Sequence, residues 1–95
     1  MTNTFRTPLI IDVRTPGEFA MGHVRGSINI PLDQFADAIA QQVPDKSTPV
    51  ILCCASGARS GMACNFMQQL GYLQISNGGS AGAVSMHHGL PIDRL

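Results

Sequence analysis

The sequence has no net charge, no long apolar run and no secretory leader pattern, and each absence excludes a class of protein. Six lysine and arginine residues balance six aspartate and glutamate residues, which removes the electrostatic attraction that favours nucleic acid or an anionic membrane as a partner. No apolar run approaches the roughly 20 residues that a membrane-spanning helix needs. Residues 1–7 are polar and lack the charged-then-apolar order of a signal peptide. We therefore expect a cytoplasmic protein with no nucleic-acid or membrane partner.

Cysteine and histidine are scarce and poorly spaced for cross-links or metal ligation. The chain has three cysteines, an odd number, and two of them, Cys53 and Cys54, are adjacent. Adjacent cysteines bridge only through a strained ring, so we expect reduced thiols, with Cys64 as a small packing residue. No C-x-x-C or H-x3-H spacing joins the cysteines to His87 and His88, which are expected to be exposed. The sequence thus predicts neither a metal site nor a cofactor.

Strand-like and helix-like segments alternate along the chain. The 95 residues, 44% of them hydrophobic and 13% charged, suit one globular domain over residues 1–95, and we expect a monomer. Strands are predicted over residues 9–12, 27–30, 50–53 and 72–75, helices over 16–21, 32–43, 81–88 and from the cysteine loop to Gly71, and a turn over 77–80. Connections too long for hairpins then predict an α/β fold, a mainly parallel sheet with helices on both faces.

Capping residues and apolar spacing define the predicted helices. Thr15 and Glu18 have the spacing of a capping box, Phe19 and Met21 are expected to anchor the first short helix, and Gly22 is expected to end it. The buried faces of the two longer helices are predicted at Leu32, Phe35, Ala36, Ile39, Ala40 and Val43, and at Ala63, Phe66, Met67 and Leu70. These faces indicate core packing and carry no chemistry.

A loop of small residues between Cys54 and Arg59 joins a buried strand to a helix. A helix N-terminus leaves backbone N–H groups unpaired and carries partial positive charge, so it attracts anions. Small side chains let this backbone curl, and Gly57 can adopt dihedrals that other residues avoid. The loop amides, the helix dipole and Arg59 would all favour a thiolate, so the pKa of a cysteine here should be lowered.

Either Cys53 or Cys54 could lie at the centre of this loop, and the spacing distinguishes them. Counted from Cys53, the interval to Arg59 is C-x5-R, which suits a phosphatase loop around a tetrahedral phosphate; from Cys54 it is C-x4-R, which suits a single sulfur atom. The glycine expected three residues after a phosphatase cysteine is Gly57 only if counting starts at Cys54; from Cys53 that position is Ser56. Cys53 also completes the apolar strand. We therefore predict Cys54 as the nucleophile, with a Cys53-dependent phosphatase or arsenate reductase as an alternative.

Several short motifs occur in the same order as in a known family. They are Asp12-Val13-Arg14, Pro16 with Glu18-Phe19, Gly22-His23-Val24, Gly26, Asn29-Ile30-Pro31, Cys54-x-Ser56-Gly57-x-Arg59-Ser60 and Gly71-Tyr72. Together they resemble the rhodanese homology domain over nearly the whole chain, and the short length resembles its single-domain, phage-shock type in bacteria. The sequence departs from the family at Cys53, where tyrosine or phenylalanine is usual, and after Gly78-Gly79, where the usual tryptophan is absent.

The resemblance implies a small rhodanese-like fold and a sulfurtransferase activity. The family's cysteine, here Cys54, takes the outer sulfur of thiosulfate as a persulfide, releases sulfite, and passes the sulfur to cyanide or a thiol. A cellular persulfide or another sulfane-sulfur compound could replace thiosulfate as the donor. The amides expected to surround the persulfide belong to Ala55, Ser56, Gly57, Ala58, Arg59 and Ser60. Arg59 would also hold the incoming dianion or shield the persulfide. No separate general base is required, because the thiolate is preformed.

Four further residues are expected to support the site. Arg14, Glu18 and His23 could bind substrate, but all three belong to the family's structural pattern, and we expect them to form one hydrogen-bonded cluster that fixes the first loop. Asp12, at a strand end, is expected to support the cysteine loop. A function of another class also stays open, namely a non-catalytic sulfur carrier or redox sensor that requires a partner protein.

Overall fold

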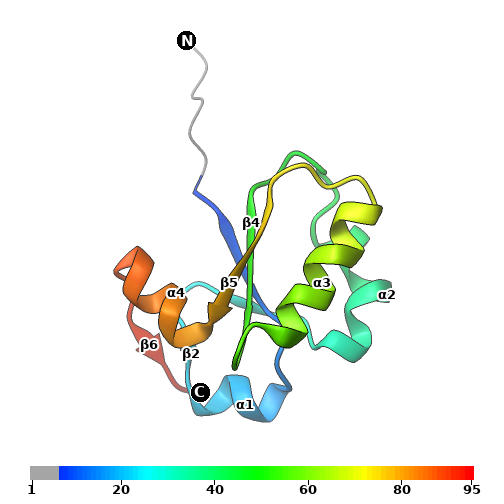
Figure 1. Ribbon diagram of the computed structural model, residues 1–95. Coiled ribbons are helices and arrows are strands. Elements are labelled where there is room, and N and C mark those ends of the chain that lie inside the picture. Colours follow the sequence, from blue (N-terminus) through cyan, green and yellow to red (C-terminus); the bar gives the residue numbers. More distant parts are fainter. Residues whose placement is uncertain (1–6) are drawn as a thin grey trace.

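The computed structural model describes residues 7–95, in which four parallel strands form the central sheet (Figure 1). Their order across the sheet is β3-β1-β4-β5, with bounds β1 Leu9–Asp12, β3 Ile28–Asn29, β4 Val50–Cys54 and β5 Ile75–Ser80. The predicted α/β class with a mainly parallel sheet is confirmed. The N-terminal segment considered above for a signal peptide lies, apart from Thr7, outside the described residues.

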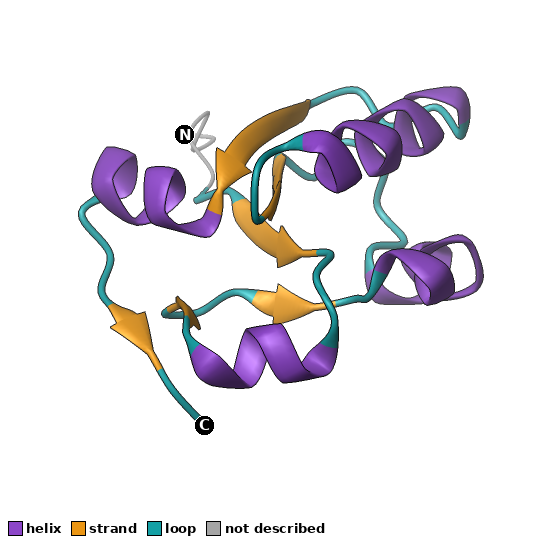
Figure 2. Ribbon diagram, turned by 60° about the horizontal axis from the view of Figure 1, so that its bottom comes forward, coloured by secondary structure: helices purple, strands orange, loops and turns teal. Residues whose placement is uncertain are grey.

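Within residues 7–95, four helices accompany the sheet (Figure 2). They are α1 Pro16–Met21, together with α2 Leu32–Gln42 and α3 Ala58–Gln69 against one face and α4 Ala81–His88 against the other. Phe35 of α2 and Met67 of α3 pack with Leu52 on one face, whereas Val84 of α4 packs with Ile51 on the other. Because successive side chains of a strand point to opposite faces, β4 contributes to two separate cores. No helix within residues 7–95 is both long and apolar enough to cross a bilayer.

Local sequence signals account for the ends of two helices. Thr15 and Glu18 form the predicted capping box at the start of α1, with each side chain bonded to the other's backbone N–H. The last turn of α3 closes on Gly71, whose φ is 95°, and Tyr72 N–H bonds back to the Met67 carbonyl at 3.1 Å. The expectation that Met21 anchors α1 is wrong, because its side chain is 77% exposed.

The fourth strand is displaced from its predicted place. The sequence predicted a strand over residues 72–75 and a turn over 77–80, but β5 runs from Ile75 to Ser80. A Cβ on Gly78 would lie 2.5 Å from a Val84 methyl and 2.8 Å from an Ile51 methyl. Gly78 therefore serves close packing beneath α4, whereas Gly79 has open space around it and a left-handed φ of 82°. A bulge shifts the register between Leu52 and Cys53, so that Gly78 is the extra residue on β5.

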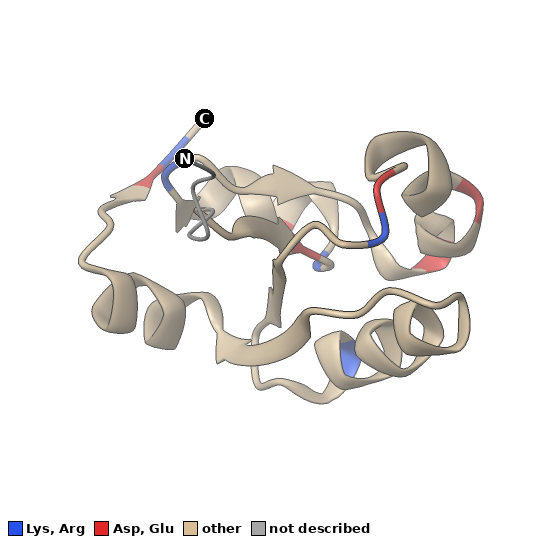
Figure 3. Ribbon diagram, turned by 90° about the horizontal axis from the view of Figure 1, so that it is seen from above, with Lys and Arg blue, Asp and Glu red and all other residues tan. Residues whose placement is uncertain are grey.

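A second, two-stranded sheet joins the C-terminal segment to the first loop. In it β2 His23–Val24 pairs antiparallel with β6 Ile92–Asp93, two segments for which the sequence predicted no strand. Arg25 and Asp93 reinforce this pairing with two hydrogen bonds of 2.9 and 3.0 Å. The charged residues of α2, Asp33 and Asp37, are both acidic (Figure 3).

Candidate active site

The cysteine loop begins at the carboxyl end of β4 and continues into α3. Cys54 is the last residue of β4, and Gly57, with a left-handed φ of 100°, is the N-cap of α3. The Cys54 sulfur accepts a hydrogen bond from Gly57 N–H at 2.9 Å and lies 3.5 Å from the Ser60 hydroxyl. The loop therefore aims donors at one sulfur atom, as the small residues and the helix start predicted.

These donors change the acidity of Cys54. Burial opposes ionisation, but hydrogen bonds from the Ser60 side chain and from the backbone of Ser60, Gly57 and Ser56 outweigh it and lower the thiol pKa to about 7. Burial, and next the charge of Asp12, raise the pKa of Cys53 to about 12. Cys53 is fully buried in the core beneath α4. At neutral pH, only Cys54 of this pair has an appreciable thiolate population.

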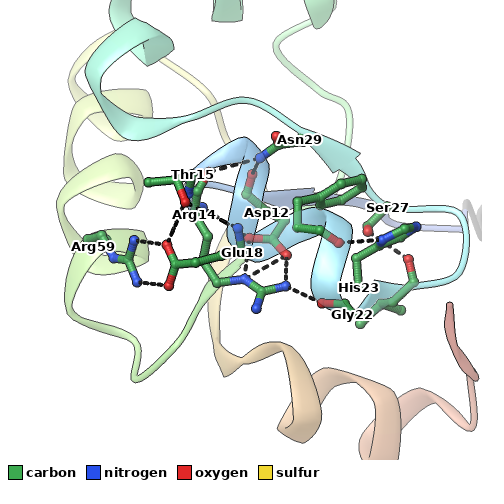
Figure 4. A network of polar contacts seen from close by, with 11 residues as sticks. Asp12, Arg14, Thr15, Glu18, Gly22, His23, Ser27, Asn29 and Arg59 are labelled. Carbon is green, nitrogen blue, oxygen red and sulfur yellow. Dashed lines mark hydrogen bonds and ion pairs between the residues drawn. The ribbon is translucent and has the colours of Figure 1, made fainter. Parts of the chain in front are cut away.

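Arg59 is held by an ion pair with α1. Its two terminal nitrogens bond to the two Glu18 carboxylate oxygens at 2.7 and 3.0 Å (Figure 4). The Arg59 bonds, and next the Thr15 backbone N–H, lower the pKa of Glu18 to about 2. Glu18 therefore joins α1 to α3 across 41 positions of sequence.

Arg14 binds a different carboxylate. Its guanidinium donates to both oxygens of Asp12, at 3.0 Å from Nε and 2.7 Å from the terminal nitrogen, and the same terminal nitrogen reaches the Gly22 carbonyl at 2.7 Å. The Asp12 side chain is fully buried, so the ion pair compensates a charge that burial alone would make costly. Together, these contacts fix the chain between β1 and β2.

Within the described residues, His23 forms no hydrogen bond with Arg14 or Glu18. Its Nδ1 lies 2.8 Å from the Phe19 carbonyl, and its ring stacks on the Phe19 ring with centroids 3.8 Å apart. Arg14, Glu18 and His23 therefore make no direct hydrogen bond to one another within residues 7–95, and they are connected only through other residues of the first loop, Thr15, Phe19 and Gly22. The intervening helix α1 separates them: Glu18 lies in its first turn, against α3, and His23 follows its C-terminal end (Figure 4).

Asn77 is a neighbour of the cysteine loop that the sequence did not indicate. Its Nδ2 donates to the Gly57 carbonyl at 2.9 Å, and its Oδ1 accepts from the Ser60 hydroxyl at 2.7 Å and from Gly79 N–H at 3.0 Å. It was missed because residues 77–80 were predicted as a turn. A polar amide beside two glycines, on the strand that follows the cysteine strand, is the signal that could have identified it.

Comparison with known proteins identifies the family of this chain. Residues 2–84 match the rhodanese-like domain family. This chain belongs to that family. It is 40% identical over 76 residues to thiosulfate sulfurtransferase PspE of Escherichia coli K12, covering 80% of this chain and 73% of the relative. It is 33% identical over 84 residues to a sulfurtransferase of Allochromatium vinosum, covering 88% and 77%.

A solved structure supports the same family. A rhodanese with anions from E. coli superposes with a TM-score of 0.84 at 34% identity, covering 94% of this chain and all of that one. The rhodanese-like fold expected from the resemblance is therefore confirmed.

The other predicted site residues of this rhodanese-like domain differ in exposure. Ala55, Ser56 and Ala58 are exposed on the loop, whereas Ser60 is fully buried. A cleft beside Arg59 is lined by Val13, Thr15, Pro16, Pro31 and Leu32, together with Asp33 and Gln34. Cys64, on α3, is buried in the core, and His87 and His88 are exposed at the end of α4. Within residues 7–95, no group of three or more histidine, cysteine or acidic residues could hold a metal ion.

Proposed function

We propose that this protein is a thiosulfate sulfurtransferase in which Cys54 carries the transferred sulfur as a persulfide. The observation that carries the proposal is the Cys54 sulfur, held at the junction of β4 and α3 among loop donors that lower its pKa to about 7. Family membership and the sulfurtransferase relatives support it. Thiosulfate is the donor named for the PspE relative.

In the first step, the Cys54 thiolate attacks the outer sulfur of thiosulfate. A bond forms between Sγ and that sulfur, the sulfur–sulfur bond of thiosulfate breaks, and sulfite leaves with the electron pair. The enzyme keeps a persulfide, so one transfer is divided into two easier displacements. No general base is needed, because the attacking atom is already ionised in an appreciable part of the molecules at neutral pH.

The loop donors would stabilise the negative charge that passes through the sulfur atoms. Gly57 N–H already points at Sγ, so it needs little reorganisation during reaction. A guanidinium has five N–H donors, and the ion pair with Glu18 uses two of those on Arg59. The remaining donors of Arg59 would hold the thiosulfate dianion beside the loop.

In the second step, the acceptor attacks the outer sulfur of the persulfide. Cyanide or a thiolate forms the new bond to that sulfur, the bond to Sγ breaks, and Cys54 returns to a thiolate. The products are thiocyanate from cyanide or a persulfide from a thiol. The second step therefore regenerates the free enzyme with Cys54 as a thiolate.

Mass spectrometry and a sulfite assay test the proposal together. Incubation with thiosulfate should add the mass of one sulfur atom at Cys54 and release an equal amount of sulfite. Cys54→Ser should abolish both, whereas Cys53→Ser, a matched change at the adjacent residue, should keep most of the transfer. If wild type gives no adduct and no sulfite, or if Cys53→Ser loses the activity instead, the proposal is wrong.

The same experiment separates the alternative functions. A persulfide that forms on Cys54 but is discharged by neither cyanide nor glutathione would indicate a sulfur carrier that requires a specific protein. A phosphatase or arsenate reductase built on Cys53 would need that thiol to ionise, and burial holds its pKa at about 12. Hydrolysis of an aryl phosphate that depends on Cys53 would restore that alternative.

A further inference from the structure

Asn77 lies on β5, the neighbour of the cysteine strand, and contacts the cysteine loop through both ends of its amide. We propose that Asn77 is a positioning residue for sulfur transfer, holding Gly57 and Ser60 so that their donors surround the Cys54 sulfur. The inference rests on the proposed role of Cys54. No contact between Asn77 and the sulfur itself is needed, because Asn77 acts through the two residues that do contact it.

The first contact fixes the turn of the loop. The Gly57 carbonyl accepts from Asn77 Nδ2 at 2.9 Å and from Gly61 N–H at 2.9 Å, so both of its lone pairs are used. Within the cysteine loop, Gly57 has the left-handed φ, and its own N–H points at Cys54 Sγ. Holding the carbonyl of this residue therefore restrains the orientation of its N–H toward the sulfur.

The second contact fixes the Ser60 side chain. Ser60 has one hydroxyl proton and two acceptors within reach, Asn77 Oδ1 at 2.7 Å and Cys54 Sγ at 3.5 Å. In the thiol state, the shorter bond to Asn77 holds the proton and leaves a lone pair toward the sulfur. When the thiolate forms, the proton turns to the sulfur, because hydrogen bonds to a charged acceptor are stronger. Asn77 therefore holds the Ser60 oxygen near the sulfur in the thiol state. After the proton turns, Asn77 Oδ1 keeps its bond from Gly79 N–H, and Nδ2 still holds the Gly57 carbonyl.

The partners also determine how the Asn77 amide is oriented. One end faces two donors, the Ser60 hydroxyl and Gly79 N–H, and the other end faces the Gly57 carbonyl. Only the orientation with Oδ1 toward the two donors satisfies all three contacts. Since β5 pairs with β4, with Asn77 opposite Leu52, the amide stands on the strand next to the nucleophile.

Loss of Asn77 could change the pKa of Cys54 in either direction, and the direction distinguishes a positioning role from competition for the Ser60 proton. If Asn77 positions the loop, Gly57 and Ser60 lose alignment and the pKa of Cys54 rises. If Asn77 mainly competes with the thiolate for the Ser60 proton, the pKa falls. The positioning role predicts a rise of about half a pH unit or more for Asn77→Ala, comparable to the loss of one hydrogen bond.

Asn77→Asp sharpens the test because it keeps the shape of the side chain. The carboxylate keeps acceptors for Ser60 and Gly79, loses the donor to Gly57, and adds a negative charge near the sulfur. We therefore expect a larger rise in the pKa of Cys54 than for Asn77→Ala. The residue is exposed, so neither change leaves a cavity in the core.

The experiment measures iodoacetamide modification of Cys54 against pH, by mass spectrometry of the tryptic peptide over residues 47–59. Cys53 in the same peptide stays protonated in the range used. Asn65→Ala, at an exposed position of α3, is the matched control and should give the wild-type profile. Thermal unfolding checks the fold of each variant, and Asn77→Ser replaces Asn77→Ala if the latter is unfolded.

A double variant tests whether Asn77 acts through Ser60. The shift for Ser60→Ala with Asn77→Ala should be smaller than the sum of the two single shifts, because both changes remove part of one network. An additive result, or an Asn77→Ala profile equal to wild type or shifted to lower pH, would overturn the proposal. Alkylation needs no sulfur donor, so this result stands apart from any failure of sulfurtransferase activity.

Discussion

Cys53 and Cys54 are neighbours in the chain, yet their side chains point to opposite faces of the sheet and into different cores. Cys53 points into the core beneath α4, where burial raises its pKa to about 12. Cys54 points toward α3, where Gly57 and Ser60 supply donors and its pKa is about 7. Both side chains are almost completely buried. Burial opposes ionisation of both thiols, and only Cys54 has hydrogen-bond donors that outweigh it.

The largest expected effect is a difference in reactivity between the two thiols in the wild-type protein. Because the thiolate is the reactive form, modification of Cys54 should increase as pH rises through about 7 and then level off. Cys53 should stay protonated until about pH 12, so its rate at neutral pH should be lower by a factor on the order of 10⁴. Alkylation resolved by residue measures both rates. Equal rates in the folded protein would contradict the comparison.

The next effect concerns packing on the Cys53 side of the sheet. Gly78→Ala would place a Cβ 2.5 Å from a Val84 methyl and 2.8 Å from an Ile51 methyl, so we expect a loss of about 1–3 kcal/mol in the free energy of unfolding. Gly82→Ala is the matched control, because the nearest atom lies at 3.8 Å and alanine favours a helix. Chemical denaturation compares the two. A Gly78→Ala variant as stable as wild type would show that β5 and α4 separate easily.

The smallest effect concerns the charge beside the Cys54 loop. Glu18→Gln removes the carboxylate that holds Arg59 and keeps a residue suited to the capping box. Arg59 is then free for the thiosulfate dianion, so the KM for thiosulfate should fall about two- to threefold with kcat unchanged. The effect is modest because the ion pair is about one-third exposed.

Asp93→Asn provides the control for that change. Asp93 forms an exposed ion pair with Arg25 on the small second sheet, in which two guanidinium nitrogens bond to the carboxylate, as in the Arg59–Glu18 pair. The substitution weakens this pair, which lies away from the cysteine loop. We expect the KM to stay at the wild-type value. A KM that rises in Glu18→Gln would mean that the ion pair holds Arg59 in the orientation that thiosulfate requires.

Much of the fold could be predicted because the signals are local. The apolar runs gave β1 and most of β4, the spacing of apolar residues gave α2, and the Thr15–Glu18 pattern gave the start of α1. The strand at residues 72–75 was misplaced because Gly78, which serves close packing, looks like a turn residue in the sequence. Only the neighbouring α4 side chain shows why a glycine is needed at position 78.

The sequence by itself determined which cysteine faces the loop. Alternation along β4 and the counts to Gly57 and Arg59 depend only on residues close together in the chain. Tertiary structure alone decided what surrounds that loop. Arg59 meets Glu18 across 41 residues, and Asn77 reaches Gly57 and Ser60 from β5. Such contacts depend on the order of strands and on how α1 packs against α3, and no local pattern encodes them.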